Sequence, residues 1–195
     1  MKKIVLSVVF AGITCAAPLA FGWDPGEVEE HDAKAQEAIA AFKEKDSSVN
    51  RFFDAAAGYV VIPTVGKGGR GIGGARGKGL LSEGGEPTAI VTLTQLTIGF
   101  QWGGQAYSEF IFFEDQNALD HFKKGNYELG AQASAVAVTA GASADANYSS
   151  GVAIFTQAKG GLMYEASVGG QKFKVEAQLS IASFLIIENT ARRRM

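Results

Sequence analysis

The segment GKGGRGIGGARGKG, residues 66–79, contains eight glycines, four basic residues and no carboxylate. In a β-strand, successive side chains point to opposite faces, so this segment would have two different sides. The small side consists of Gly71, Gly73, Ala75, Gly77 and Gly79, and the other side carries Arg70, Ile72, Gly74, Arg76, Lys78 and Leu80. A side without bulk predicts close approach of another backbone or a sharp bend of a sheet.

The same segment does not fit a nucleotide-binding loop. Residues 66–71 match the spacing G-x-G-x-x-G, but that fingerprint needs a helix to begin at its last glycine, and more glycines follow here. A Walker loop is excluded because Ile72 occupies the position of its first glycine and Gly79 that of its hydroxyl residue. The glycines therefore predict strand packing rather than phosphate-loop chemistry.

After residue 58 the chain consists of short apolar runs separated by glycine-bearing turns, which is typical of strands. We expect strands at 59–62, 69–81, 88–102, 107–113, 128–139, 152–157, 162–168 and 173–177, whereas residues 179–187 fit a strand or a short helix equally well. Most of these strands lack the long connections that parallel pairing requires. The sequence predicts an α+β fold: a strongly curved antiparallel β-sheet or partial barrel covered by N-terminal helices and one inserted helix.

Three helices are expected. Residues 27–45 place apolar side chains near one helical face, namely Val28, Ala35, Ile39 and Phe42. This helix either covers the sheet or lies on a bilayer, and its acidic start favours the first alternative. A second, short helix is expected from a cap at Ser47 or Ser48 to Gly58, and the inserted helix spans about 115–124.

The N-terminus has the pattern of a secretory signal peptide. Two lysines precede the apolar run 4–20, and small residues flank Phe21 at Ala20 and Gly22. We expect cleavage near Gly22 and a periplasmic or secreted protein. The alternative, a lipoprotein acylated at Cys15, fits less well because Gly12 and Thr14 stand where lipoproteins need other residues. The expected division is 1–22 signal peptide, 23–46 N-terminal amphipathic helix and 47–195 main domain.

Charge and cysteine content exclude several classes of function. Cys15 is the only cysteine, so the mature chain would have no thiol for disulfides, nucleophilic catalysis or metal binding. Removing Lys2 and Lys3 leaves 18 − 2 = 16 basic residues against 20 acidic ones. A mildly acidic chain is not a polycation, and we do not expect nucleic acid as a partner.

No catalytic constellation is evident in the sequence. His31 and His121 are the only histidines, and neither adjoins a nucleophile or a second metal ligand with suitable spacing. We therefore expect a binding protein rather than an enzyme, with no catalytic residues, no metal and no cofactor.

An ordered series of motifs resembles the SYLF domain family. The motifs are Gly58-Tyr59-Val60-Val61-Ile62-Pro63, the glycine-rich run 68–79, IGFQWGGQ at 98–105, FIFFE at 110–114, ALDHF at 118–122, ELGA at 128–131 and AKGGL at 158–162. The resemblance covers about residues 48–170. It implies binding to anionic phospholipid, since eukaryotic relatives are phosphoinositide-binding actin regulators and bacterial relatives are described as lipid-binding envelope proteins. Actin is not expected as a partner of a secreted bacterial protein.

On this resemblance we expect Lys67, Arg70, Arg76 and Lys78 to contact lipid phosphates, with Trp102, and also Phe100 or Tyr107, at the interfacial region. The alternative is that the cations form a solvated strand face and the aromatic side chains belong to the core. A structural or protein-interaction module that docks another envelope protein, without a lipid ligand, is the competing function.

Overall fold

The computed structural model describes residues 25–130, 133–159 and 168–178, and it leaves out the side chains of residues 25–27, 69–72, 97–104 and 177–178. The helical elements are α1 (Pro25–Lys45), the 3-10 turn η1 (Ser47–Val49), α2 (Asn50–Ala55) and α3 (Gln116–Lys123). The strands are β1 (Gly58–Glu83), β2 (Glu86–Phe113), β3 (Tyr127–Glu128), β4 (Val136–Ala137), β5 (Val152–Ala158) and β6 (Gln171–Gln178).

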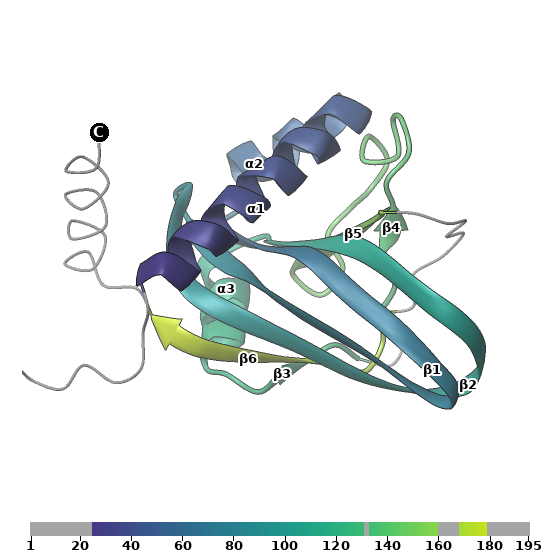
Figure 1. The fold of residues 1–195 in the computed structure, drawn as a ribbon. Coiled ribbons are helices and arrows are strands. Elements are labelled where there is room, and N and C mark those ends of the chain that lie inside the picture. Colours follow the sequence, from purple (N-terminus) through teal and green to yellow (C-terminus); the bar gives the residue numbers. More distant parts are fainter. Residues whose placement is uncertain (1–24, 131–132, 160–167, 179–195) are drawn as a thin grey trace, which may run out of the picture.

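Strand β2 is the centre of a six-stranded sheet. Antiparallel β1 lies along one edge of β2, while β6 pairs with residues 89–95 and β5 with residues 107–113 along the other. Strand β3 pairs with β6, and β4 pairs with β5 in parallel. The sheet curls strongly into a half-barrel (Figure 1). The predicted α+β class and curved sheet are confirmed, with the parallel β4–β5 pair as the one exception among the described strands.

The two longest strands form a single hairpin. Its turn consists of Gly84 and Gly85, whose φ angles are +60° and +88°. Two consecutive positive φ angles define the type I′ geometry that suits a two-residue hairpin loop, and glycine adopts them without steric cost. The predicted strands 59–62 and 69–81 are parts of the continuous strand β1, and 88–102 and 107–113 are parts of β2.

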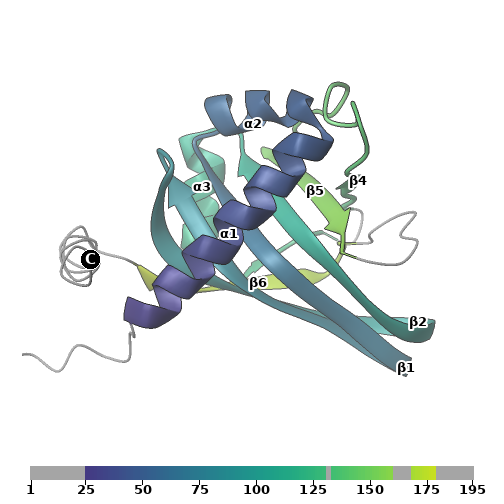
Figure 2. The same cartoon turned by 45° about the horizontal axis from the view of Figure 1, so that its top comes forward.

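Helices cover both sides of the sheet, with α1 and α2 on one side and α3 on the other (Figure 2). The α1 residue Phe42 is fully buried, and its ring centroid lies 4.5 Å from that of Phe110 and 5.5 Å from that of Phe155. Val28 packs with Leu80 and Ile90. The apolar face of α1 is therefore occupied by the sheet, as the acidic start of this helix predicted.

The other side of the sheet forms the inner core. Buried side chains of β1, β2 and β6 pack there with Leu119 and Phe122 of α3. The Phe122 ring centroid lies 4.8 Å from Phe113 and 5.7 Å from Phe173. Asp115 caps the helix, because its side chain accepts a hydrogen bond from the Ala118 backbone N–H. The inserted helix is therefore confirmed within one residue at each end.

Three sequence expectations differ from the structure. The cap after α1 is Asp46 rather than Ser47 or Ser48, and Gly58 begins β1 rather than ending a helix. The expected strand 128–139 is reduced to the two-residue strands β3 and β4. The expected signal peptide, the segment 179–187 and most of the expected strand 162–168 lie outside the described residues.

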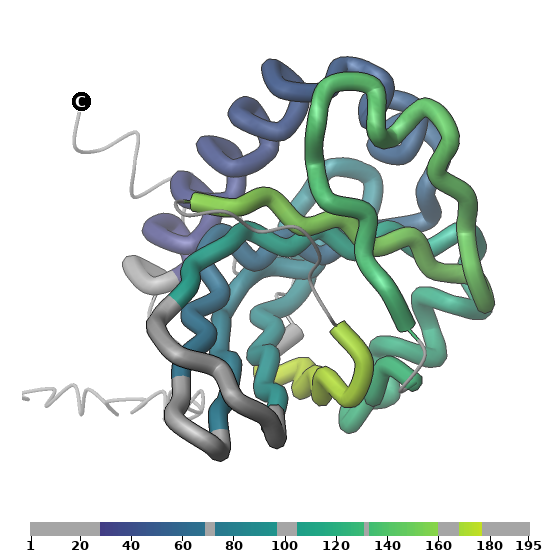
Figure 3. Tube along the Cα trace, turned by 90° about the vertical axis from the view of Figure 1, so that its right-hand side faces the viewer, coloured from purple at the N-terminus to yellow at the C-terminus, as the bar shows by residue number. Residues whose placement is uncertain are grey.

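Asp46 connects the helical layer to the segment after β4, which arches beside α2 in Figure 3. One carboxylate oxygen accepts from the Ser48 backbone N–H at 3.1 Å, and the other accepts from the Ser143 N–H at 2.7 Å. Arg51 donates to the carbonyl oxygens of Ser143 and Ala146. Burial raises the pKa of Asp46, but the hydrogen bonds from Ser48 and Ser143 outweigh it and lower the pKa to about 2.

We expect Asp46→Ala to lower the free energy of unfolding at neutral pH by roughly 2 kcal/mol, since a helix cap and a bond to a buried N–H are lost together. Because its folded pKa is depressed, Asp46 stabilises the protein above about pH 4, and this contribution is lost as the pH falls toward 2. Urea denaturation at several pH values measures both effects, with exposed Asp54→Ala as control. An equal loss for the two variants would contradict the assignment.

Candidate functional site

The glycine side of β1 packs against the first part of the same strand. Gly77 and Gly79 are buried, and a Cβ atom built on Gly79 would lie 2.0 Å from the carbonyl oxygen of Val61 and 2.7 Å from the Cα of Ile62. Residues 73–79 alternate as predicted, with the odd positions buried and the even positions more accessible. The strand therefore has one side closed by its own backbone and one side turned outward.

The outward side of β1 joins two neighbouring strands in a basic surface. Arg76 lies opposite Thr94, which lies opposite Lys172 of β6. Lys78 lies in the same way opposite Thr92, and Thr92 opposite Lys174. Directly opposed residues share one face of a sheet, so the cations of β1 and β6 flank a central pair of threonines. We call this surface, defined by Arg76, Lys78, Thr92, Thr94, Lys172 and Lys174, the basic face.

Two carboxylates partly balance the basic face. Lys172 Nζ lies 3.5 Å from Glu128, and Lys78 Nζ lies 4.0 Å from Glu176, at the limit of an ion pair. Arg76 and Lys174 form no ion pair with any residue that the structure describes. The basic face thus carries four cations against two neighbouring carboxylates.

Two further side chains distinguish the basic face from an ordinary solvated strand surface. Leu96 follows Thr94 on the same side of β2 and is 74% exposed. Thr92 is only 6% exposed, and its hydroxyl group has no hydrogen-bond partner within the described part of the chain. An apolar side chain therefore projects beside the cations, and a buried hydroxyl lies between two of them.

The five expected contact residues are only partly brought together. Arg76 and Lys78 share the basic face. Lys67 is two residues from the buried Val65 and so lies on the same side of β1 as Val65, opposite the basic face. The side chains of Arg70 and Trp102 lie outside the described residues. Their backbones fall where the β1–β2 register shifts, between the pairs Gly69–Gly103 and Gly71–Gly99.

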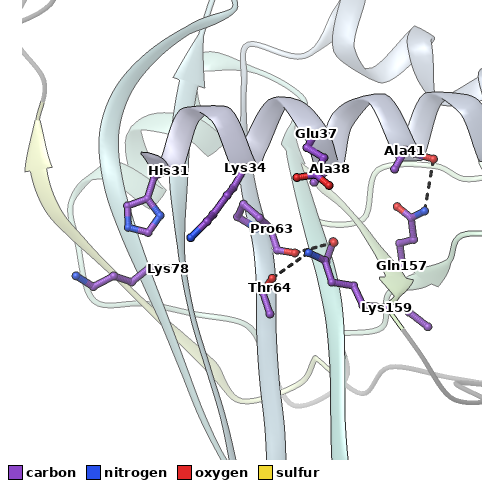
Figure 4. Close-up of a pocket in the computed structure, with 12 residues that line it drawn as sticks. His31, Lys34, Glu37, Ala38, Ala41, Pro63, Thr64, Lys78, Gln157 and Lys159 are labelled. Carbon is purple, nitrogen blue, oxygen red and sulfur yellow. Dashed lines mark hydrogen bonds between the residues drawn. The ribbon is translucent and has the colours of Figure 1, made fainter. Parts of the chain in front are cut away.

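A cavity of about 420 Å³ lies between α1 and the sheet, next to the basic face (Figure 4). Its cationic lining comes from three distant parts of the sequence, Lys34 on α1, Lys78 on β1 and Lys159 after β5. Lys159 Nζ donates to the Thr64 hydroxyl at 3.0 Å. His31 also lines this cavity. Lys78 belongs to both the cavity and the basic face.

Comparison with known families finds one family model that matches the second half of the chain. Residues 94–183 match the family model Ysc84, described as "Las17-binding protein actin regulator". This region, which we call the SYLF region, is therefore similar to the SYLF family. The resemblance noted in the sequence is therefore confirmed, although the matched residues begin later and end later than the motifs did. The SYLF region starts within β2 and includes Leu96, Lys172 and Lys174, whereas Arg76 and Lys78 precede it.

A curated relative of the chain is Beta cell expansion factor A of Aeromonas veronii. The two sequences are 31% identical over 81 residues, which amount to 42% of this chain and 31% of the relative. The match thus spans about a third of the length of that protein.

The SYLF region contains a buried polar group that the sequence reading missed. Glu109 is fully buried in the sheet, and Gln171 Nε2 donates to its Oε2 at 2.9 Å and to the Tyr107 hydroxyl at 3.3 Å. The other oxygen of Glu109 and the Oε1 of Gln171 have no partner among the described residues. Burial raises the pKa of Glu109 to about 8, although the Gln171 hydrogen bond opposes this shift. The carboxyl group is therefore mainly protonated at neutral pH.

The strand period could have revealed this carboxyl group. Glu109 lies on the same side of β2 as Tyr107, Ile111 and Phe113, because strand residues two apart share a face, and these three side chains are buried in the inner core. Tyr107 is only 1% exposed. It is therefore a core residue, and the prediction that it contacts the interfacial region of a membrane is wrong. Burial raises the pKa of its hydroxyl, and the neighbouring Glu109 raises it further.

Within residues 25–130, 133–159 and 168–178, no group of three or more histidine, cysteine, aspartate or glutamate side chains could hold a metal ion. Over the same residues, none of the helices combines the length and the apolar character that a membrane crossing requires.

Proposed function

We propose that this protein binds anionic lipid surfaces through the basic face, and that it acts by binding rather than by catalysis. The observation that carries the proposal is the pair of cross-strand rows Arg76–Thr94–Lys172 and Lys78–Thr92–Lys174. Neighbouring strands lie about 4.8 Å apart, so the cations at either end of a row are separated by about 10 Å, a spacing suited to separate phosphates in a lipid surface. The lipid-binding character attributed to SYLF relatives supports the same interpretation.

The energetics favour weak, salt-sensitive binding. A cation near an anionic membrane contributes about 1 kcal/mol, and Glu128 and Glu176 offset part of this attraction. Leu96 would enter the interfacial region, and full burial of such a side chain contributes roughly 2 kcal/mol.

Vesicle co-sedimentation tests this proposal. We expect the protein to bind vesicles containing phosphatidylglycerol, to release them as sodium chloride rises, and to ignore neutral phosphatidylcholine vesicles. Arg76→Gln/Lys174→Gln should weaken binding roughly tenfold, because it removes the two cations of the basic face that have no described ion pair. Lys45→Gln/Lys124→Gln is the charge-matched control, since both lysines are exposed and lie away from this face, Lys45 at the end of α1 and Lys124 directly after α3.

Two outcomes would show that the basic face is not the lipid-binding surface. One is vesicle binding that does not depend on lipid charge or salt, and the other is an equal loss of binding in both double variants. Leu96→Ser adds an independent readout, since it should reduce vesicle binding by removing the exposed apolar side chain while the charge of the basic face is unchanged. Absence of any vesicle binding would instead favour the protein-interaction module.

We also propose that the protein acts in the bacterial cell envelope, in the periplasm or as a secreted protein. The apolar N-terminal run that ends at Ala20-Phe21-Gly22 supports export. A compartment outside the cytoplasm also argues against actin as the partner. Recovery of the protein from the cytoplasm with Met1 retained would contradict this part of the proposal.

A further inference from the structure

We propose that the cavity beneath α1 binds the phosphate monoester of a small polyol. This site is distinct from the basic face, with which it shares only Lys78, and its ligand need not be part of a membrane. The 420 Å³ cavity is of the size that binds small organic molecules, so a phosphate group would leave room for the attached polyol.

The lining has the charge that a phosphate group requires. The residues that line the cavity include three lysines, Lys34, Lys78 and Lys159. Glu37 is the only carboxylate among these lining residues. Lys159 is bonded to a neutral hydroxyl, that of Thr64, so its charge is not neutralised by this contact. Figure 4 shows Lys34 directed from α1 toward β1, which carries both Thr64 and Lys78.

Each of the other two lysines lies near one carboxylate that the structure describes. Lys34 pairs with Glu30 at 2.6 Å along α1, but its side chain remains 54% exposed, and such an exposed pair is weak. Lys78 lies 4.0 Å from Glu176, so a phosphate oxygen at a normal hydrogen-bond distance would interact more strongly than this carboxylate.

Neutral and acidic groups in the same lining suit the hydroxyl groups of a polyol. Gln157 Nε2 donates to the Ala41 carbonyl oxygen at 3.4 Å, which leaves its amide oxygen as an acceptor. Glu37 lies on the α1 side of the cavity and would accept from a ligand hydroxyl. The polar lining consists of three amines, an imidazole, an amide, two hydroxyl groups and one carboxylate, and it favours a ligand that is anionic at one end and hydroxylated at the other.

Calorimetric titration of the purified protein with glycerol 3-phosphate tests the site, with glycerol and inorganic phosphate as the two partial ligands. We expect glycerol 3-phosphate to bind more tightly than inorganic phosphate, and glycerol not to bind. Lys34→Gln/Lys159→Gln should weaken glycerol 3-phosphate binding at least roughly tenfold, because two charge-assisted hydrogen bonds are lost. Both lysines are exposed, so this variant should keep the wild-type melting temperature.

The controls separate this site from the basic face. Arg76→Gln/Lys174→Gln should leave glycerol 3-phosphate binding within roughly twofold, since neither residue lines the cavity. If the folded Lys34→Gln/Lys159→Gln variant binds glycerol 3-phosphate as tightly as the wild type, the proposed site is wrong. Absence of glycerol 3-phosphate binding to the wild type overturns a site for free phosphate monoesters, whatever the vesicle experiments show.

A second arm distinguishes a free ligand from a lipid headgroup of the same chemistry. Phosphatidic acid vesicles carry a phosphate monoester, whereas phosphatidylglycerol carries a diester. If glycerol 3-phosphate competes with phosphatidic acid vesicles and the Lys34→Gln/Lys159→Gln variant loses that preference, the cavity also accepts the headgroup. If the preference persists in the variant, headgroup binding at this cavity is excluded.

Discussion

Glu109→Gln should raise the free energy of unfolding at about pH 8 by on the order of 3 kcal/mol. The wild-type carboxyl group is fully buried in the sheet, and its pKa is raised to about 8. Glutamine has nearly the same shape but never ionises, so folding no longer requires this group to hold a proton. Its amide also introduces a donor beside Gln171, whose Oε1 has no described partner.

The effect depends on pH in a defined direction. Between the ordinary pKa of about 4.5 and the folded pKa of about 8, the folded protein retains a proton that the unfolded chain releases. Stability therefore falls by up to about 1.4 kcal/mol per pH unit as the pH rises through this window. Below it, both states are protonated and the contribution of Glu109 to the difference between wild type and variant disappears.

Urea denaturation of wild type and Glu109→Gln at about pH 5 and about pH 8 measures this difference. The exposed Glu114→Gln, which removes a carboxylate a few residues away, is the control and should show no comparable slope. A wild-type advantage at the higher pH would mean that Glu109 is ionised in the folded protein, contrary to the raised pKa.

Gly79→Ala should destabilise the protein by on the order of 3 kcal/mol or more. The added methyl group would lie 2.0 Å from the Val61 carbonyl oxygen and 2.7 Å from the Cα of Ile62. Both contacts are with backbone atoms of a paired strand, which cannot move aside without breaking the sheet. The two halves of β1 would therefore have to separate.

Gly66→Ala is the matched control, because it lies in the same strand and its new methyl group would meet nothing within 4 Å. We expect a change of at most about 0.5 kcal/mol there. Gly77→Ala should fall between the two, since its closest contact, at 2.6 Å, is a side-chain methyl of Ile62. Thermal melting of the three variants tests this order, and a Gly79→Ala protein as stable as Gly66→Ala would contradict the observed packing.

Much of the fold was predictable because it follows from local periodicity. The alternation of small and cationic residues in 73–79 predicted which side of β1 is closed, and the spacing of Val28, Ala35, Ile39 and Phe42 predicted the buried face of α1. Errors occurred where periodicity is weak. The alanine-rich segment 128–139 is compatible with a strand by composition, yet only Glu128, Val136 and Ala137 among its described residues belong to β3 or β4.

The candidate site was less predictable than the fold. Arg76 and Lys78 were found in the sequence, since both lie in one strand. Lys172 and Lys174 lie about a hundred residues later in the chain, and only the β2–β6 pairing places them in the same rows. The cavity lysines Lys34 and Lys159 were not predicted for the same reason. They line one cavity only because α1 packs on the sheet.

The sequence alone thus determined the curved α+β architecture, the two-sided character of the glycine strand and the resemblance to the SYLF family, since each is carried by residues close together in the chain. The tertiary structure alone decided that Gly79 lies against Val61, that Glu109 is buried, and which cations share a surface. Those features depend on pairing between distant segments, and local side-chain periodicity carries no information about which segments pair.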